Sequence, residues 1–139
     1  MRIVRLILSA ALAASALVGI QILSTDYWLW SAAPIHAYGL MAFVALDLAL
    51  IFGIWRATRL IIFGALVTAS VQLLAMLGDI IAGEPAGLPA SVFRNYLLTD
   101  TAYVGLLVTQ GLIMAIAIGT WALPHLHGHW LASSKIVRK

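Results

Sequence analysis

Cysteine is absent from this 139-residue sequence, and charged residues make up only 9% of it. The absence of cysteine excludes disulfides, thiolate metal sites, iron–sulfur ligation and cysteine nucleophiles. The shortage of charge excludes an ordinary water-soluble surface, because soluble domains carry charge on about 25% of their residues. Hydrophobic residues instead make up 63% of the chain. Lipid is therefore the expected solvent for most of its surface.

The apolar residues are gathered into four runs, each near the roughly 20 residues that a membrane-spanning helix needs. The spans are expected at about residues 3–23, 34–55, 60–82 and 101–123. The first run has the basic start of a signal peptide, but its length favours a retained span. Because the connections are too short to hold a domain, residues 1–139 are expected to form one all-α membrane domain, a four-helix antiparallel bundle.

Polar residues and prolines mark the segments between and after these spans. Residues 24–31 are expected to form a polar, aromatic turn at the depth of the lipid headgroups. Residues 86–98 are amphipathic and are expected to lie at the membrane interface as a short helix. Pro124 is expected to end or kink the fourth span, leaving a polar tail over residues 124–139.

Basic residues are distributed unevenly about the expected spans. On one side of the membrane that these spans define, the only basic residue is Arg94. On the other side are Arg2, Arg5, Arg56, Arg59, Lys135, Arg138 and Lys139. Because lysine and arginine are retained on the cytoplasmic side during insertion, both termini are expected in the cytoplasm. The formal net charge of +3 therefore reflects the topology of a multi-pass cell-membrane protein, and no nucleic-acid partner is expected.

Small residues recur at every fourth position in three of the spans. The three series are Ala11-Ser15-Gly19, Ala45-Ala49-Gly53 and Gly111-Ala115-Gly119. Small side chains let helix backbones approach closely in lipid, where the hydrophobic effect contributes little to association. The second and third series favour packing seams, either within the bundle or against another subunit, whereas the first has an equally good explanation in an alanine-rich composition.

Asp47 lies near the middle of the second span, where a bare carboxylate costs roughly 2.5–3.5 kcal/mol on insertion scales. His36 precedes it by eleven residues, about three turns, which places both on one helix face. One hypothesis is a proton or ion relay from His36 to Asp47. The alternative, which we favour, is a buried aspartate hydrogen-bonded to a neighbouring helix. Gln72 and Gln110 are also expected to be interhelical hydrogen-bond partners.

A group of polar residues collects at the other, extracytoplasmic end of the expected bundle. It includes Asp79, Asp100 and Arg94 together with His36 and other acidic residues, and Tyr103 lies one turn inside Asp100. Carboxylates and a histidine are possible ligands for a divalent metal. The simpler interpretation, which we favour, has Asp100 capping the fourth span and Asp79 paired with Arg94.

Three histidines alternate in the tail, at His125, His127 and His129. Such tracts can bind copper, nickel or zinc. Anchoring at the lipid headgroups beside Trp121 and Trp130 is the favoured alternative. His36 and these histidines lie at opposite ends of the expected bundle, so no internal bis-histidine haem site is expected. A haem or metal shared with a partner subunit is the remaining option, and the chain is expected to hold no cofactor of its own.

The sequence thus describes a membrane scaffold without a recognisable catalytic centre. The favoured hypothesis is an accessory, non-catalytic subunit of a multi-subunit membrane complex, most plausibly a respiratory or other redox complex, whose partners are other membrane subunits and the lipid bilayer. The alternative is a small oligomeric transporter or proton or ion channel that uses Asp47 and His36. A membrane enzyme built on the extracytoplasmic polar group is a third hypothesis.

Overall fold

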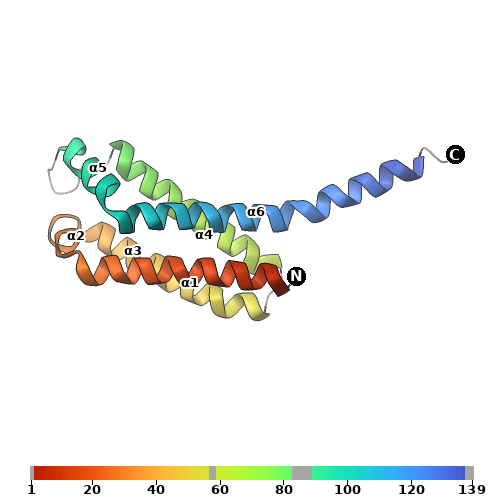
Figure 1. Cartoon of the computed structure of the whole chain (residues 1–139), viewed down its shortest axis with the longest axis horizontal. Coiled ribbons are helices and arrows are strands. Elements are labelled where there is room, and N and C mark those ends of the chain that lie inside the picture. Colours follow the sequence, from red (N-terminus) through yellow and green to blue (C-terminus); the bar gives the residue numbers. More distant parts are fainter. Residues whose placement is uncertain (1, 57–58, 83–88, 137–139) are drawn as a thin grey trace.

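The computed structural model describes the backbone of residues 2–56, 59–82 and 89–136, and the side chains of these residues except 59 and 121–136. It is all-helical over these ranges (Figure 1). The helices are α1 (Arg2–Thr25), α2 (Tyr27–Ala32), α3 (Pro34–Arg56), α4 (Arg59–Ala82), α5 (Ala90–Thr99) and α6 (Thr101–Ile136).

Four of these helices contain apolar stretches long enough to cross a membrane. The stretches are Arg2–Thr25, Pro34–Arg56, Leu60–Ala82 and Thr101–Thr120, each with a mean hydropathy of at least 1.9. Within an 18-residue apolar segment of each stretch, only 17–33% of the residues are buried inside the chain. The remaining apolar surface needs lipid as its solvent, which confirms the prediction of four membrane-length helices.

The connection between the first two spans differs from the expected turn, because it contains the short helix α2. The carboxylate of Asp26 accepts a hydrogen bond from the backbone N–H of Leu29 at 3.0 Å and caps this helix. The indole N–H of Trp30 donates to the carbonyl of Leu23 at 2.8 Å, which holds α2 against the end of α1. In the same way Asp100 caps α6 by accepting from the N–H of Ala102 at 2.7 Å.

Pro124 lies within α6, which continues to Ile136. Of the two expected outcomes, an end of the helix at Pro124 is therefore wrong. A proline removes one backbone hydrogen bond from a helix, and the helix can continue on either side of the missing bond. Figure 1 shows α6 extending far beyond the other helices.

The long helices pack around a shared interior. Helix α1 packs against α3 and α6, and α4 packs against α6 and α3. The short helices α2 and α5 lie together at one end of the structure, whereas the amino terminus lies at the opposite end (Figure 1). We call these the α2–α5 end and the amino-terminal end.

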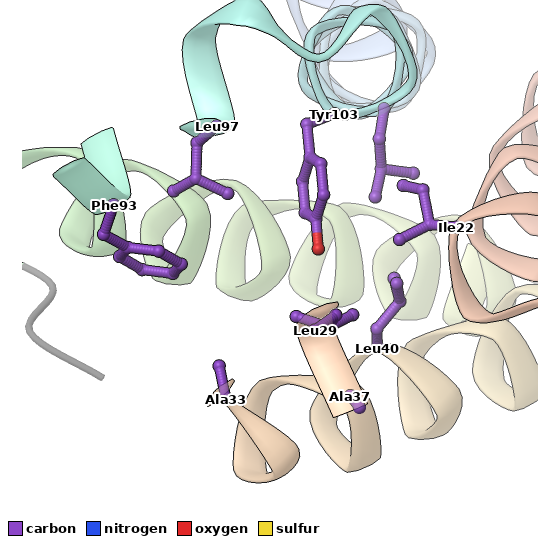
Figure 2. Packing of buried hydrophobic residues seen from close by; sticks show 9 residues of the cluster. Ile22, Leu29, Ala33, Ala37, Leu40, Phe93, Leu97 and Tyr103 are labelled. Carbon is purple, nitrogen blue, oxygen red and sulfur yellow. The ribbon is translucent and has the colours of Figure 1, made fainter. Parts of the chain in front are cut away.

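Two apolar clusters fill the interior. At the α2–α5 end the buried cluster consists of Ile22, Leu29, Ala33, Ala37, Leu40, Phe93, Leu97, Tyr103 and Leu106 (Figure 2). Towards the amino-terminal end the second cluster consists of Leu8, Leu12, Ile54, Ala65, Ala69 and Ile113. Three buried polar residues, Ser15, Asp47 and Gln110, come between the two clusters along α1, α3 and α6.

The small-residue series behave differently from one another. Ser15 and Gly19 of α1 are buried, and a Cβ atom placed on Gly19 would lie 2.5 Å from Cγ2 of Val44. By contrast, Ala45 and Ala49 of α3 are exposed. The series given least weight from the sequence therefore forms the close seam between α1 and α3, whereas in the α3 series only Gly53 is half-buried, against Ile61 of α4. Small residues permit close packing but do not determine which helix face turns inward.

Candidate functional site

A polar network joins three helices in the middle of the structure. The Nε2 atom of Gln110 donates to the hydroxyl oxygen of Ser15 at 2.5 Å, and the Ser15 hydroxyl donates to Oδ2 of Asp47 at 2.5 Å. Asp47 is only 1% exposed and Gln110 is fully buried. The Ser15 hydroxyl has a single proton, which it donates to the Asp47 carboxylate, so it acts as an acceptor towards Gln110.

This network places Asp47 with Ser15 and Gln110 and does not place it with His36. Eleven residues of helix correspond to a rise of about 16 Å. Among the described residues, no hydrogen bond joins Asp47 to His36, although a shared helix face was expected to link them. The geometry of Asp47 is that of an interhelical hydrogen-bond acceptor, and Gln110 has the interhelical role expected from the sequence.

His36 pairs with Asp79 across α3 and α4. Its Nε2 atom lies 3.1 Å from Oδ1 of Asp79, and both side chains are about one-third exposed. The His36 ring also meets the ring of Phe93 edge-on, with 5.5 Å between their centroids. The expected pairing of Asp79 with Arg94 is wrong, because Arg94 is exposed on α5, which presents Phe93 and Leu97 to the interior instead.

A cavity of about 270 Å³ lies beside the His36–Asp79 pair. Its walls come from five helices, α2 to α6. The polar residues in the lining are His36, Gln72, Asp79 and Tyr103. The other lining residues are Leu29, Ile35, Gly39, Leu40, Phe43, Ala75, Met76, Phe93, Leu97 and Leu106. A mostly apolar cavity with a few convergent polar groups is typical of a small-molecule site.

Three polar atoms in this lining are enclosed but lack a hydrogen-bond partner. They are Oε1 of Gln72, the hydroxyl oxygen of Tyr103 and Nδ1 of His36. Gln72 is 2% exposed and Tyr103 is 9% exposed. Gln72 therefore does not form the interhelical hydrogen bond expected of it. An unpartnered buried polar group costs about 1–3 kcal/mol, so a ligand that pairs with these atoms recovers that free energy.

Contacts between aromatic rings join the helices that surround the cavity at the α2–α5 end. The Trp28 ring lies 4.3 Å from that of Tyr96 and 6.0 Å from that of Phe93, centroid to centroid. Tyr96 in turn meets Tyr103 edge-on at 5.7 Å. These contacts connect α2, α5 and α6, and each such ring pair contributes roughly 0.5–1.5 kcal/mol. The segments that the sequence placed at the membrane interface therefore also form part of the cavity wall.

The metal hypotheses receive no ligand set from the described side chains. No group of three histidine, aspartate or glutamate residues with metal-binding geometry occurs among them. Asp100 is used as a helix cap, and Asp79 faces His36. The side chains of His125, His127 and His129 lie outside the described residues.

Sequence reasoning singled out His36, Asp79 and Asp47, but it did not single out Ser15 as a polar site residue. Ser15 was grouped with small packing residues, and its hydroxyl is the connecting atom of the buried network. Tyr103, one turn inside the cap residue Asp100, was expected near the extracytoplasmic polar group, and the structure adds that it lines the cavity.

Comparison with known proteins adds no family to this description. No family model matches the chain, and neither the curated proteins nor the solved structures yielded a match. Function is therefore argued from the geometry of this chain.

Proposed function

We propose that this membrane protein binds a small lipid-soluble molecule in the cavity beside the His36–Asp79 pair. The observation that carries this proposal is the enclosed and unpartnered state of the Gln72 and Tyr103 polar atoms in the cavity wall. A folded chain rarely leaves such groups unpaired, and a bound ligand would supply the missing partners. Figure 2 gives the setting of Tyr103, whose ring points from α6 towards Leu29 and Leu40.

The lining also supplies a route from the surrounding lipid. Ile35 of α3 is 81% exposed, and Ala75 of α4 is exposed, yet both residues line the cavity. The cavity therefore reaches the lateral surface between α3 and α4, and both helices are long and apolar enough to lie in a membrane. A ligand dissolved in the bilayer would enter from the side without crossing water.

Gly39→Leu is expected to abolish ligand binding while leaving the fold intact. A Cβ atom at Gly39 meets no other atom within 4 Å, and the residue lines the cavity. A leucine side chain at this position would occupy space that the ligand needs. The measurement is quenching of tryptophan fluorescence by 4-bromophenol in lipid nanodiscs, since Trp28 packs against the cavity residue Phe93.

Gly78→Leu is the matched control, because a Cβ atom there also meets nothing within 4 Å and Gly78 does not line the cavity. Saturable quenching should persist in this control and should be lost, with at least a roughly tenfold weaker apparent affinity, in Gly39→Leu. Equal quenching in the two variants would mean that 4-bromophenol acts from the lipid alone, and the proposal would be wrong.

The orientation of the protein is part of the same proposal. The excess of lysine and arginine near the amino terminus and in the tail supports cytoplasmic termini, with successive spans running in opposite directions. The cavity would then lie in the membrane leaflet away from the cytoplasm. A ligand would accordingly be drawn from that leaflet.

A second proposal is the accessory role in a larger membrane complex, and the exposed small residues of α3 favour it. Ala45 and Ala49 face outwards and would allow another helix to approach closely. A redox complex is the setting we propose for this role. Extraction in a gentle detergent followed by identification of co-migrating chains should give partners in fixed stoichiometry, and Ala45→Phe should release them. Recovery of this chain alone from the wild-type membrane would contradict the accessory role.

A further inference from the structure

The tautomer of His36 determines what the cavity can recognise. Nε2 of His36 faces Oδ1 of Asp79, and a carboxylate oxygen accepts hydrogen bonds, so in the neutral form of the His36 ring the proton is assigned to Nε2. The other ring nitrogen, Nδ1, is then an acceptor, and it is enclosed without a partner. The pairing with Asp79 thus leaves Nδ1 of His36 as an acceptor for a hydrogen bond from an O–H or N–H group of a ligand.

Two further polar groups complete the recognition pattern. The unpartnered Oε1 of Gln72 is a second acceptor, and the Tyr103 hydroxyl can donate or accept. A ligand that satisfies all three groups needs two O–H or N–H donors for the two acceptors and a third polar contact, of either kind, for Tyr103. Such a ligand also has to be largely apolar, because the polar residues are a minority in an otherwise apolar and aromatic lining.

The volume of the cavity limits the size of the bound group. An apolar cavity of about 150 Å³ is large enough to hold benzene. The cavity of about 270 Å³ therefore has room for one substituted aromatic ring or a fused pair of rings. Phe43 and Phe93 in the lining suit the faces and edges of such a ring.

The lateral opening determines where the remainder of the ligand lies. A chain attached to the ring would leave between α3 and α4, past the exposed side chain of Ile35. The opening is apolar on both helices, because the exposed residue Ala75 of α4 lines the same cavity. A polar ring inside the cavity and an apolar tail in the lipid together describe an amphipathic lipid.

We infer that the ligand is a lipid quinol, an aromatic ring with two hydroxyl groups and an apolar tail. The ring hydroxyls donate to Nδ1 of His36 and Oε1 of Gln72, and the Tyr103 hydroxyl donates to a ring oxygen. This inference rests on the proposed function, since it names the ligand class of the same cavity. It concerns binding alone and assigns no electron transfer to this chain.

The test compares two ligands of nearly equal shape in nanodiscs under nitrogen. The first is a 1,4-benzoquinol with a ten-carbon tail, and the second is its dimethyl ether, which has the same ring and tail but no O–H donor. Each competes with 4-bromophenol for the cavity. We expect the quinol to bind roughly 10–100-fold more tightly than the ether, because the ether leaves both acceptors unpaired.

Gln72→Met separates recognition from folding. The change removes an amide whose oxygen is buried without a partner in the free protein, so the variant should be at least as stable as the wild type. We expect the variant to bind the quinol about tenfold more weakly and the dimethyl ether as well as before. Gln21→Met makes the same change at an exposed position of α1 and should alter neither affinity.

The outcomes distinguish the two proposals. If 4-bromophenol binds in the Gly78→Leu variant but the quinol and its ether compete equally, the cavity binds ligands and the quinol inference is overturned. An unchanged quinol affinity in Gln72→Met would also overturn it. If 4-bromophenol, the quinol and the ether all fail to distinguish Gly39→Leu from Gly78→Leu, the cavity is not a binding site and both proposals fall together.

Discussion

Asp47→Ala is expected to lower the free energy of unfolding by about 2–3 kcal/mol. Interhelical hydrogen bonds in membranes contribute only about 0.6 kcal/mol on average, so the lost bond to Ser15 is the smaller part of the effect. The larger part is the polar hydroxyl of Ser15, left buried and without an acceptor at a cost of about 1–3 kcal/mol. Ser15 is 1% exposed, so water cannot replace the carboxylate. Unfolding in sodium dodecyl sulfate, followed by helical circular dichroism, measures the change.

Asp47→Asn is the control for this prediction, and its expected cost is less than about 1 kcal/mol. The amide oxygen of asparagine can still accept from Ser15. Its N–H group can donate to Oε1 of Gln110, which is buried without a partner in the wild-type protein. If Asn proves as damaging as Ala, the charge of Asp47 matters more than its hydrogen bond. That result would contradict the structural role and would restore the hypothesis of a proton or ion pathway through Asp47.

Gly19→Ala is expected to destabilise the protein by about 2 kcal/mol, although alanine is the better helix former. A Cβ atom at Gly19 would lie 2.5 Å from Cγ2 of Val44 and 3.5 Å from Cδ1 of Leu40. The buried Val44 side chain is β-branched and has little rotamer freedom in a helix, so it cannot move aside at low cost. Helices α1 and α3 would have to separate. Dodecyl sulfate unfolding again provides the measurement.

Two further variants test the physical reason for this effect. Val44→Ala combined with Gly19→Ala should recover part of the lost stability, because it removes the atom that the new Cβ would meet. Gly105→Ala should be neutral or stabilising, since a Cβ there meets no atom within 4 Å. A Gly19→Ala protein as stable as the wild type would show that α1 and α3 do not approach as closely as described.

The membrane character of the protein could be predicted from the sequence, and the predicted and observed spans agree closely. The length and hydropathy of an apolar run are properties of consecutive residues, so tertiary contacts are not needed to recognise them. Asp47 was recognised on the same basis, because a carboxylate in the middle of an apolar run needs a partner wherever the neighbouring helices lie. The identity of that partner, Ser15, could not be predicted in this way.

The candidate cavity shows the limit of the same reasoning. His36 and Asp79 were both noted at one end of the bundle, but Arg94 was the expected partner of Asp79. The observed partner depends on the rotation of α3, α4 and α5 about their own axes. Helix α5 turns Phe93 and Leu97 inward and leaves Arg94 exposed. Composition and periodicity do not determine the rotations of α3 and α4, because apolar residues surround most of each of these helices.

The sequence by itself thus determined that lipid is the solvent for most of the surface, how many spans there are, and which polar residues within them need a partner. Only the tertiary structure decided that Ser15, Asp47 and Gln110 share one network and that His36, Gln72, Asp79 and Tyr103 share one cavity. The physical reason is that lipid-exposed and buried faces of these helices are almost equally apolar. Packing between side chains, rather than hydrophobicity, therefore selects which faces meet.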